Sequence, residues 1–218
     1  MHDDFQFEPV HGLPEALPKD EHILWQGAPD PMRLAIEAWK MHWIIGYFVF
    51  LAIWRIGVSS ASVPFTTALS HAVPFIVLPV IACLVVYGMA TVQARSTVYT
   101  LTNKRAAMRI GAALTMTLNL PYVCIGNAAV QKRKDGNGTL SFEMIDDTRI
   151  SYLMTWPHTR PWALSRAQPS FRCIANVAEV AEIFAEAAET RVHQPRIVKN
   201  DGPVRNPAQS APNAVAAE

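Results

Sequence analysis

Few residues in this sequence stand at the spacings that covalent chemistry requires. The motifs GxSxG, HExxH, GxGxxG and the phosphate-binding Walker loop are all absent from the 218 residues. The adjacent carboxylates Asp146 and Asp147 lie between two predicted strands, where aspartate is a common turn residue. The three cysteines form no CxxC pair, which argues against a zinc site or a disulfide framework. We therefore expect no enzymatic activity, no cofactor and no metal.

The tryptophan-rich segment WPHTRPW, at positions 156–162, is the first candidate for binding. Tryptophan and arginine are enriched among the residues that dominate the energy of protein interfaces, and prolines reduce the entropy lost on docking. We predict that this segment recognises a protein partner through Trp156, His158, Arg160 and Trp162. The alternative is a loop whose tryptophans pack against their own domain.

Three consecutive basic residues are the second candidate. Lys132, Arg133 and Lys134 run into the turn sequence DGNG. A basic side chain close to an anionic bilayer contributes about 1 kcal/mol to binding, so we predict contact with anionic membrane lipid. The alternative is a solvated hairpin tip. The net charge of the chain is only +1, which gives no general attraction for nucleic acid.

The elements that must position these residues begin with a long apolar region. Positions 56–94 contain no Asp, Glu, Lys or Arg over 39 consecutive residues. About 20 apolar residues suffice to cross a bilayer core. We predict a transmembrane hairpin over residues 31–94, with spans at about 41–58 and 72–92. A helix that opens at Asp30-Pro31 is expected to run straight into the first span.

The distribution of basic residues predicts the topology of this hairpin. The loop between the spans is flanked by only one basic residue, Arg55, whereas the outer ends of the hairpin carry Arg33, Lys40, Arg95, Lys104 and Arg105. The positive-inside rule then places both termini in the cytoplasm. Residues 1–30 form an N-terminal cytoplasmic segment, which lacks the apolar stretch of a signal peptide.

Short alternating segments follow the hairpin and predict a β-domain over residues 95–193. Alternation of apolar and polar residues indicates seven strands, at about 96–102, 106–110, 114–120, 128–132, 139–144, 149–155 and 171–174. An amphipathic helix over about 177–191 should cover the open end of the sheet with Phe184 buried. The last residues, 194–218, are rich in Pro, Ala and Asn and are expected to be a disordered tail.

Two segments resemble the bacterial membrane-anchored pleckstrin-homology (PH) domain family, HILWQGAPD before the hairpin and VYTLTNKRAAMRIG after it. The resemblance implies an α+β membrane protein, with a two-helix transmembrane hairpin and a PH-like antiparallel β-domain capped by a C-terminal helix. The strand pattern alone also allows other helix-capped sheets. Within that family, three further stretches are similar to the PuhB family of photosynthetic complex assembly proteins, namely DDFQFEPVHGLPEALPKDEHILWQGAPD, MRIGAALTMTLNLP and YLMTWPHTRPWALSRAQPSFRCI.

The second resemblance implies a non-catalytic factor at the inner (intracytoplasmic) membrane of purple bacteria. Its expected partners are subunits of the photosynthetic reaction centre and core light-harvesting complex. The resemblance does not decide whether the protein forms a homo-oligomer. The alternative is a carrier that holds bacteriochlorophyll or lipid during assembly. His42 and His71 begin the two predicted spans. Since they would face opposite leaflets, they cannot ligate one pigment together.

Overall fold

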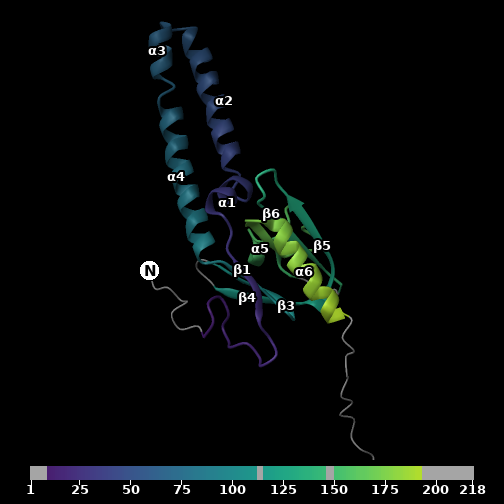
Figure 1. Cartoon of the computed structure of the whole chain (residues 1–218). Coiled ribbons are helices and arrows are strands. Elements are labelled where there is room, and N and C mark those ends of the chain that lie inside the picture. Colours follow the sequence, from purple (N-terminus) through teal and green to yellow (C-terminus); the bar gives the residue numbers. More distant parts are fainter. Residues whose placement is uncertain (1–8, 112–114, 146–149, 193–218) are drawn as a thin grey trace, which may run out of the picture.

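Two long helices form a hairpin that projects from a β-domain (Figure 1). This computed structural model describes residues 9–111, 115–145 and 150–192. Helix α2 (Met41–Ser60) and helix α4 (Pro74–Arg95) lie side by side, and the short helix α3 (Phe65–Ser70) lies at the far end of the hairpin. The two helices cover the predicted spans. The segment between the two long helices was expected to be a loop, but it contains the short helix α3.

The apolar side chains of the hairpin lie mostly on its outside. The most apolar window of α2 is 0% buried, and that of the continuous segment Phe65–Arg95 is 6% buried. A core helix of a soluble domain would instead be largely covered by protein. Both helices are long and apolar enough to cross a membrane, so their composition is compatible with membrane association.

The helix expected to run straight from Asp30 into the first span is broken in two. Helix α1 (Pro31–Glu37) begins as predicted, because the Asp30 carboxylate accepts a 2.7 Å hydrogen bond from the Arg33 backbone N–H. The expected continuation is wrong, since Lys40 takes a left-handed φ of 55° immediately before α2. The break lets α1 bury Leu34 and Ala35 against the base of α4.

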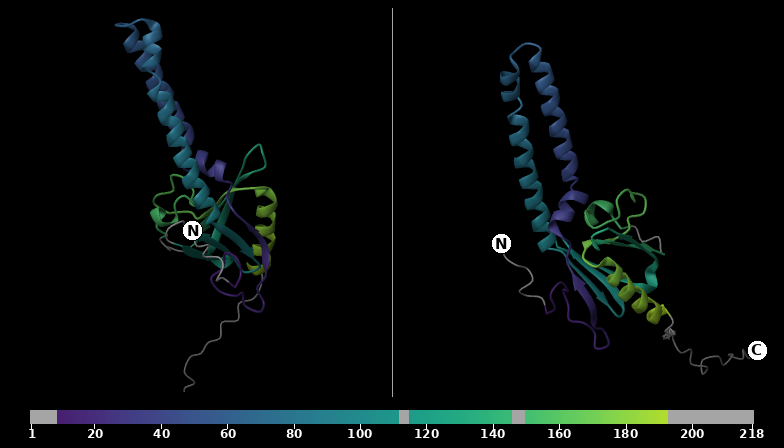
Figure 2. Two further views of the ribbon diagram at one scale, coloured as in Figure 1. Left: turned by 90° about the vertical axis from the view of Figure 1, so that its left-hand side faces the viewer. Right: turned by 45° about the horizontal axis from the view of Figure 1, so that its top comes forward.

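The β-domain contains two antiparallel sheets (Figure 2). The order in the first sheet is β1 (Ile23–Gly27), β2 (Val98–Thr102), β3 (Arg105–Ile110) and β4 (Met116–Pro121). The order in the second is β5 (Ile125–Lys132), β6 (Gly138–Met144) and β7 (Ser170–Ile174). The DGNG turn joins β5 and β6 as predicted, and Gly136 supplies a left-handed φ of 82° there.

Strand β1 comes from the segment that was expected to be separate from the β-domain. It pairs antiparallel with β2, with Trp25 opposite Leu101. The Trp25 ring also stacks on Phe171 of β7, at a centroid distance of 6.0 Å. The domain is therefore assembled from chain on both sides of the helical hairpin, and its boundary does not lie at residue 95.

The strand expected at 149–155 is wrong, because Tyr152–Thr155 forms the short helix α5. Strand β6 pairs directly with β7, with Leu140 opposite Phe171. That pairing leaves no place between them for another strand. Asp146, Asp147 and the expected tail at 194–218 lie outside the described residues.

One core joins the two sheets and helix α6 (Val177–Val192). Phe184 is 7% exposed and packs at 5.3 Å from Tyr122 and 5.2 Å from Phe142, measured between ring centroids. Tyr122 lies in the single-turn helix η2 (Tyr122–Cys124), and Phe142 lies in β6. The expected helix and its buried Phe184 are therefore confirmed.

Replacing Phe184 by alanine should destabilise the domain by about 3–5 kcal/mol, because the cavity cannot refill in a packed aromatic core. Thermal unfolding of the purified full chain would measure the loss. Glu182→Ala is the control, since Glu182 is exposed on the same helix and such changes usually stay within about 0.5 kcal/mol. Equal stability of the two variants would contradict the packed helix.

Candidate functional site

The WPHTRPW segment divides into an inner half and an outer half. An isolated bridge pairs Thr159 with Pro169. The Ser170 N–H donates to the His158 carbonyl at 2.8 Å, and the Arg160 N–H donates to the Gln168 carbonyl at 2.9 Å. These bonds tie residues 158–160 to the start of β7. The chain beyond them, from Pro161 to Arg166, turns back over the surface and keeps Trp162 85% exposed.

His158 is part of the protein interior rather than of a recognition surface. Its exposed fraction is 0%, and its Nδ1 lies 2.5 Å from the Tyr99 hydroxyl. The His158 Nε2 lies 3.2 Å from the Thr97 Oγ1, which in turn donates to the Gln93 carbonyl at 2.8 Å. The prediction that His158 contacts a partner is therefore wrong, because the end of α4 and strand β2 already surround the ring.

Polar groups lie beside both nitrogens of the His158 ring. The Tyr99 hydroxyl next to Nδ1 also accepts from the Arg172 N–H at 3.3 Å. Nε2 lies 3.2 Å from the Thr97 Oγ1 and 3.4 Å from the Gln93 Nε2. Burial, together with the smaller effect of the nearby Arg172 charge, lowers the pKa of His158 to about 3. Burial also raises the pKa of Tyr99. Both groups are therefore neutral at physiological pH.

The other aromatic residues of the segment lie closer to the surface. Trp156 is 36% exposed and packs edge-on against Trp39 at a centroid distance of 5.0 Å, which joins the loop to the α1–α2 break. Trp162 has far more of its ring uncovered. Three other large apolar residues between α5 and β7 or within α5 are also exposed, and we call the four together the apolar loop surface: Leu153, Met154, Trp162 and Leu164. Leu153 and Met154 are absent from the predicted binding residues because they fall in the strand expected at 149–155, and Leu164 lies just beyond the WPHTRPW segment.

The predicted lysine-arginine cluster does not act as a single patch. Lys132 and Lys134 are exposed, whereas Arg133 turns inward and its Nε lies 2.6 Å from the Glu37 Oε1. The neighbouring Asp135 forms an ion pair with Arg33. The hairpin tip is thus attached to helix α1 by two ion pairs, and one of the three cations is engaged in such a pair.

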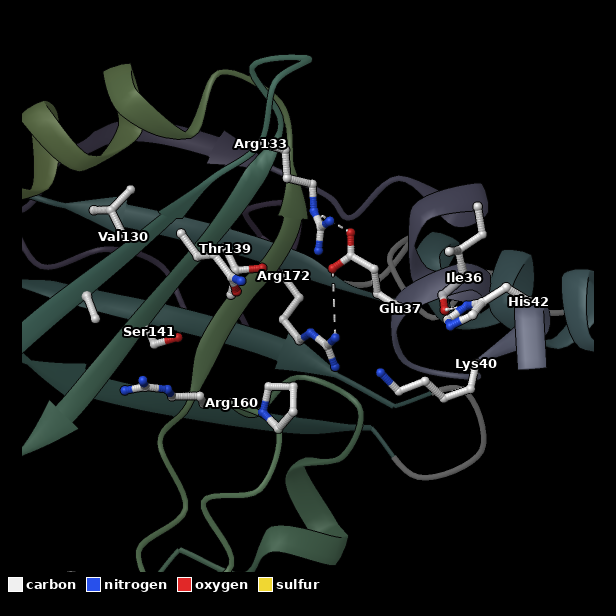
Figure 3. A pocket seen from close by; sticks show the side chains of 13 residues that line it. Ile36, Glu37, Lys40, His42, Val130, Arg133, Thr139, Ser141, Arg160 and Arg172 are labelled. Carbon is white, nitrogen blue, oxygen red and sulfur yellow. Dashed lines mark hydrogen bonds and ion pairs between the residues drawn. The ribbon is translucent and has the colours of Figure 1, made fainter. Parts of the chain in front are cut away.

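A cavity of about 650 Å³ lies between α1, the β5–β6 hairpin and the loop before β7 (Figure 3). Four cationic side chains line it, from Lys40, Arg133, Arg160 and Arg172. One carboxylate, Glu37, also lines it. Arg160 hydrogen-bonds the Gln168 Oε1 at 3.1 Å, and Arg172 donates to the Pro157 carbonyl at 2.9 Å. We call this cavity the basic pocket. Of these four cations, only Arg133 and Arg160 are among the residues predicted from the sequence. Arg133 belongs to the predicted lipid contact and Arg160 to the predicted partner-binding segment.

The buried Cys173 offers no reactive thiol. All three cysteines are free thiols, and Cys173 is buried beside α1 and α4. Burial raises the pKa of the Cys173 thiol to about 12, and the charge of Glu37 adds to the effect. A thiol that stays protonated is a poor nucleophile and a poor metal ligand.

Comparison with known proteins identifies the class to which this architecture belongs. The bacterial PH domain family matches residues 46–188, so the chain belongs to that family. A relative in Rhodobacter capsulatus, described as an uncharacterized 23.7 kDa protein in the puhA 5' region, is 39% identical over 200 residues. That match covers 89% of this chain and 92% of the relative. The conserved length includes the hairpin as well as the β-domain.

One solved structure also matches, a DUF1696 family protein with a pleckstrin-homology domain from Shewanella loihica. It is 12% identical, covers 42% of this chain and 71% of its own, and has a TM-score of 0.28.

The buried His158 predicts a stability that falls with acidity. The unfolded ring titrates near pH 6.5, whereas the folded pKa is about 3. Between these values the unfolded chain binds a proton that the folded chain does not, so acid favours unfolding. The loss from pH 7 to pH 5 should approach about 2 kcal/mol.

Thermal unfolding of the full chain at several pH values would measure this slope. His158→Gln should be less stable at pH 7 but should show a flatter profile. His22→Gln is the matched control, since His22 is exposed, and it should keep the wild-type profile. Parallel profiles for wild type and His158→Gln would contradict the assignment.

Proposed function

We propose that this protein is a membrane-anchored, non-catalytic assembly factor of the PuhB type for the reaction centre and core light-harvesting complex of purple bacteria. The relative from Rhodobacter capsulatus supports the link to photosynthesis through its description, which names the puhA region. Its identity of 39% extends over nearly the full length of both chains. A shared role is therefore expected to involve the hairpin and the β-domain together.

The observation that carries the proposal is the apolar loop surface. Leu153 is 84% exposed, Trp162 85%, Met154 68% and Leu164 67%. Four large apolar side chains from one short stretch of chain are thus left exposed to water, and such exposure is typical of an interaction site. Trp156 connects this loop to Trp39 at the base of the hairpin. A partner that contacts the surface would therefore lie beside the membrane, as a subunit with apolar helices would.

The anchor is inferred from the hairpin itself. Water would leave the apolar side chains of α2 and α4 without cover, whereas lipid would cover them at no cost. We infer that both helices span the inner membrane, with both termini and the β-domain on the cytoplasmic side, as the bias of basic residues favours.

A pigment carrier is the weaker candidate. His42 lies in the first turn of α2, and His71 lies beyond α3 at the other end of the hairpin. The His42 Nδ1 is 3.2 Å from the Ile36 carbonyl, and the His71 Nδ1 is 3.2 Å from the Ser59 Oγ. Rings at opposite ends of the hairpin cannot enclose one pigment between them.

The double substitution Trp162→Ala with Leu164→Ala should leave the fold stable and reduce the amount of photosynthetic complex in cells. Loss of a binding hot spot costs about 2–4 kcal/mol, or about 30- to 1000-fold in affinity. Crosslinking in the native membrane and absorption spectra of the antenna would measure the effect. Val123→Ala is the control, because Val123 is 50% exposed outside this loop. Unchanged complex levels in a stable double variant would refute the docking role.

Topology can be tested with single cysteines in a background whose native cysteines are replaced by alanine. A membrane-impermeant thiol reagent added to spheroplasts should label Ser62→Cys, at the far end of the hairpin, because that end is expected outside. Lys134→Cys should react only after the membrane is opened. The reverse pattern would contradict cytoplasmic termini, and labelling of both sites would contradict a membrane-spanning hairpin.

A further inference from the structure

We propose that the basic pocket binds the phosphate group of an anionic lipid. Its lining carries four cationic side chains, from Lys40, Arg133, Arg160 and Arg172, against the single carboxylate of Glu37. The pocket thus has three positive charges in excess, in a chain whose net charge is +1. Like charges gathered around one cavity repel each other, and a bound anion removes that repulsion.

Arg172 provides the fixed part of this site. It projects from β7 and is 4% exposed. Its guanidinium donates one hydrogen bond, to the Pro157 carbonyl, and stays 3.9 Å from the nearer Glu37 oxygen. The Pro157 bond and the strand hold the guanidinium in place at the lining of the pocket. A guanidinium held in this way suits the paired oxygens of a phosphate.

Strand alternation makes this face of the sheet polar. Successive side chains of a strand point to opposite faces. Leu140, Phe142 and Phe171 enter the core, whereas Thr139, Ser141 and Arg172 line the pocket. The two hydroxyl groups add neutral donors to the charged ones. The pocket therefore belongs to the rigid sheet and does not depend on a loop alone.

Lys40 and Arg160 lie at the two ends of the cavity. Figure 3 shows the Lys40 side chain extending toward Arg172 from one end, while Arg160 lies at the other end beside Ser141. Arg133 is already engaged by Glu37 at 2.6 Å. Lys40 and Arg160 are exposed, and both can turn to an incoming anion.

The position of the pocket selects a lipid over a soluble phosphate, and this step rests on the membrane anchor proposed above. Lys40 immediately precedes α2, and His42 in the first turn of α2 also lines the cavity. The start of a membrane-spanning helix lies at the level of the lipid head groups, and basic pockets there bind anionic head groups. The cavity volume of about 650 Å³ falls in the range of about 300–1,000 Å³ that is usual for small-molecule sites.

The test compares two variants of the full chain that lose the same charge. Lys40→Gln with Arg160→Gln removes two cations from the pocket, and Lys132→Gln with Lys134→Gln removes two from the exposed hairpin tip. Each detergent-purified protein is incubated with equal amounts of phosphatidylglycerol and phosphatidylcholine, and native mass spectrometry measures the retained lipid. Wild type and the tip variant should prefer phosphatidylglycerol. The pocket variant should lose that preference by about 10-fold or more, since each cation near the head group contributes about 5-fold.

Two results would overturn the proposal. Equal losses in both variants would mean diffuse attraction by surface charge, with no defined site. Displacement of the retained lipid by millimolar inorganic phosphate, with equal thermal stabilisation by phosphate alone, would mean a site for soluble phosphate. The proposed membrane anchor is tested separately, by the thiol labelling described above. A chain that inserts correctly but shows no lipid preference would refute only the pocket.

Discussion

The buried contact between His158 and Tyr99 is the interaction on which the rest of the arrangement depends. Through Tyr99 it reaches strand β2, and through Thr97 it reaches the end of helix α4. Tyr99 also stacks on Phe171 of β7 at a centroid distance of 4.7 Å. One neutral imidazole therefore joins the hairpin, both sheets and the loop after α5. Since each buried polar atom needs its partner, these elements keep a fixed relation to one another.

A second set of contacts attaches helix α1 to the same region. Glu37 lies between Arg133 of the β5–β6 hairpin and Arg172 of β7. Ion pairs at partly buried positions contribute little net stability but penalise the loss of one partner. Their main effect here is positional, because they hold α1 against the second sheet while Leu34 and Ala35 pack on α4. The basic pocket is the space left between these parts.

The proposed binding surfaces share one end of the molecule. The apolar loop surface extends from the chain that His158 anchors, and the basic pocket adjoins the same chain at Arg160 and Pro161. The Trp39–Trp156 contact attaches both to the base of the hairpin. A protein partner and a lipid head group would thus meet this domain at the membrane surface, in a geometry set by a rigid core.

Elements with local signals could be predicted from the residues alone. Uninterrupted apolar residues indicated α2 and α4, the DGNG turn indicated the β5–β6 hairpin, and helical periodicity indicated α6 with Phe184 inward. Features that depend on residues far apart in the sequence appear only in the folded structure. Only the fold brings β1 beside β2, turns 152–155 into a helix, and buries His158, because the same WPHTRPW residues suit a core or a surface equally well. The pocket could not be predicted either, since Lys40, Arg160 and Arg172 meet only when the break before α2 and the pairing of β6 with β7 bring them together.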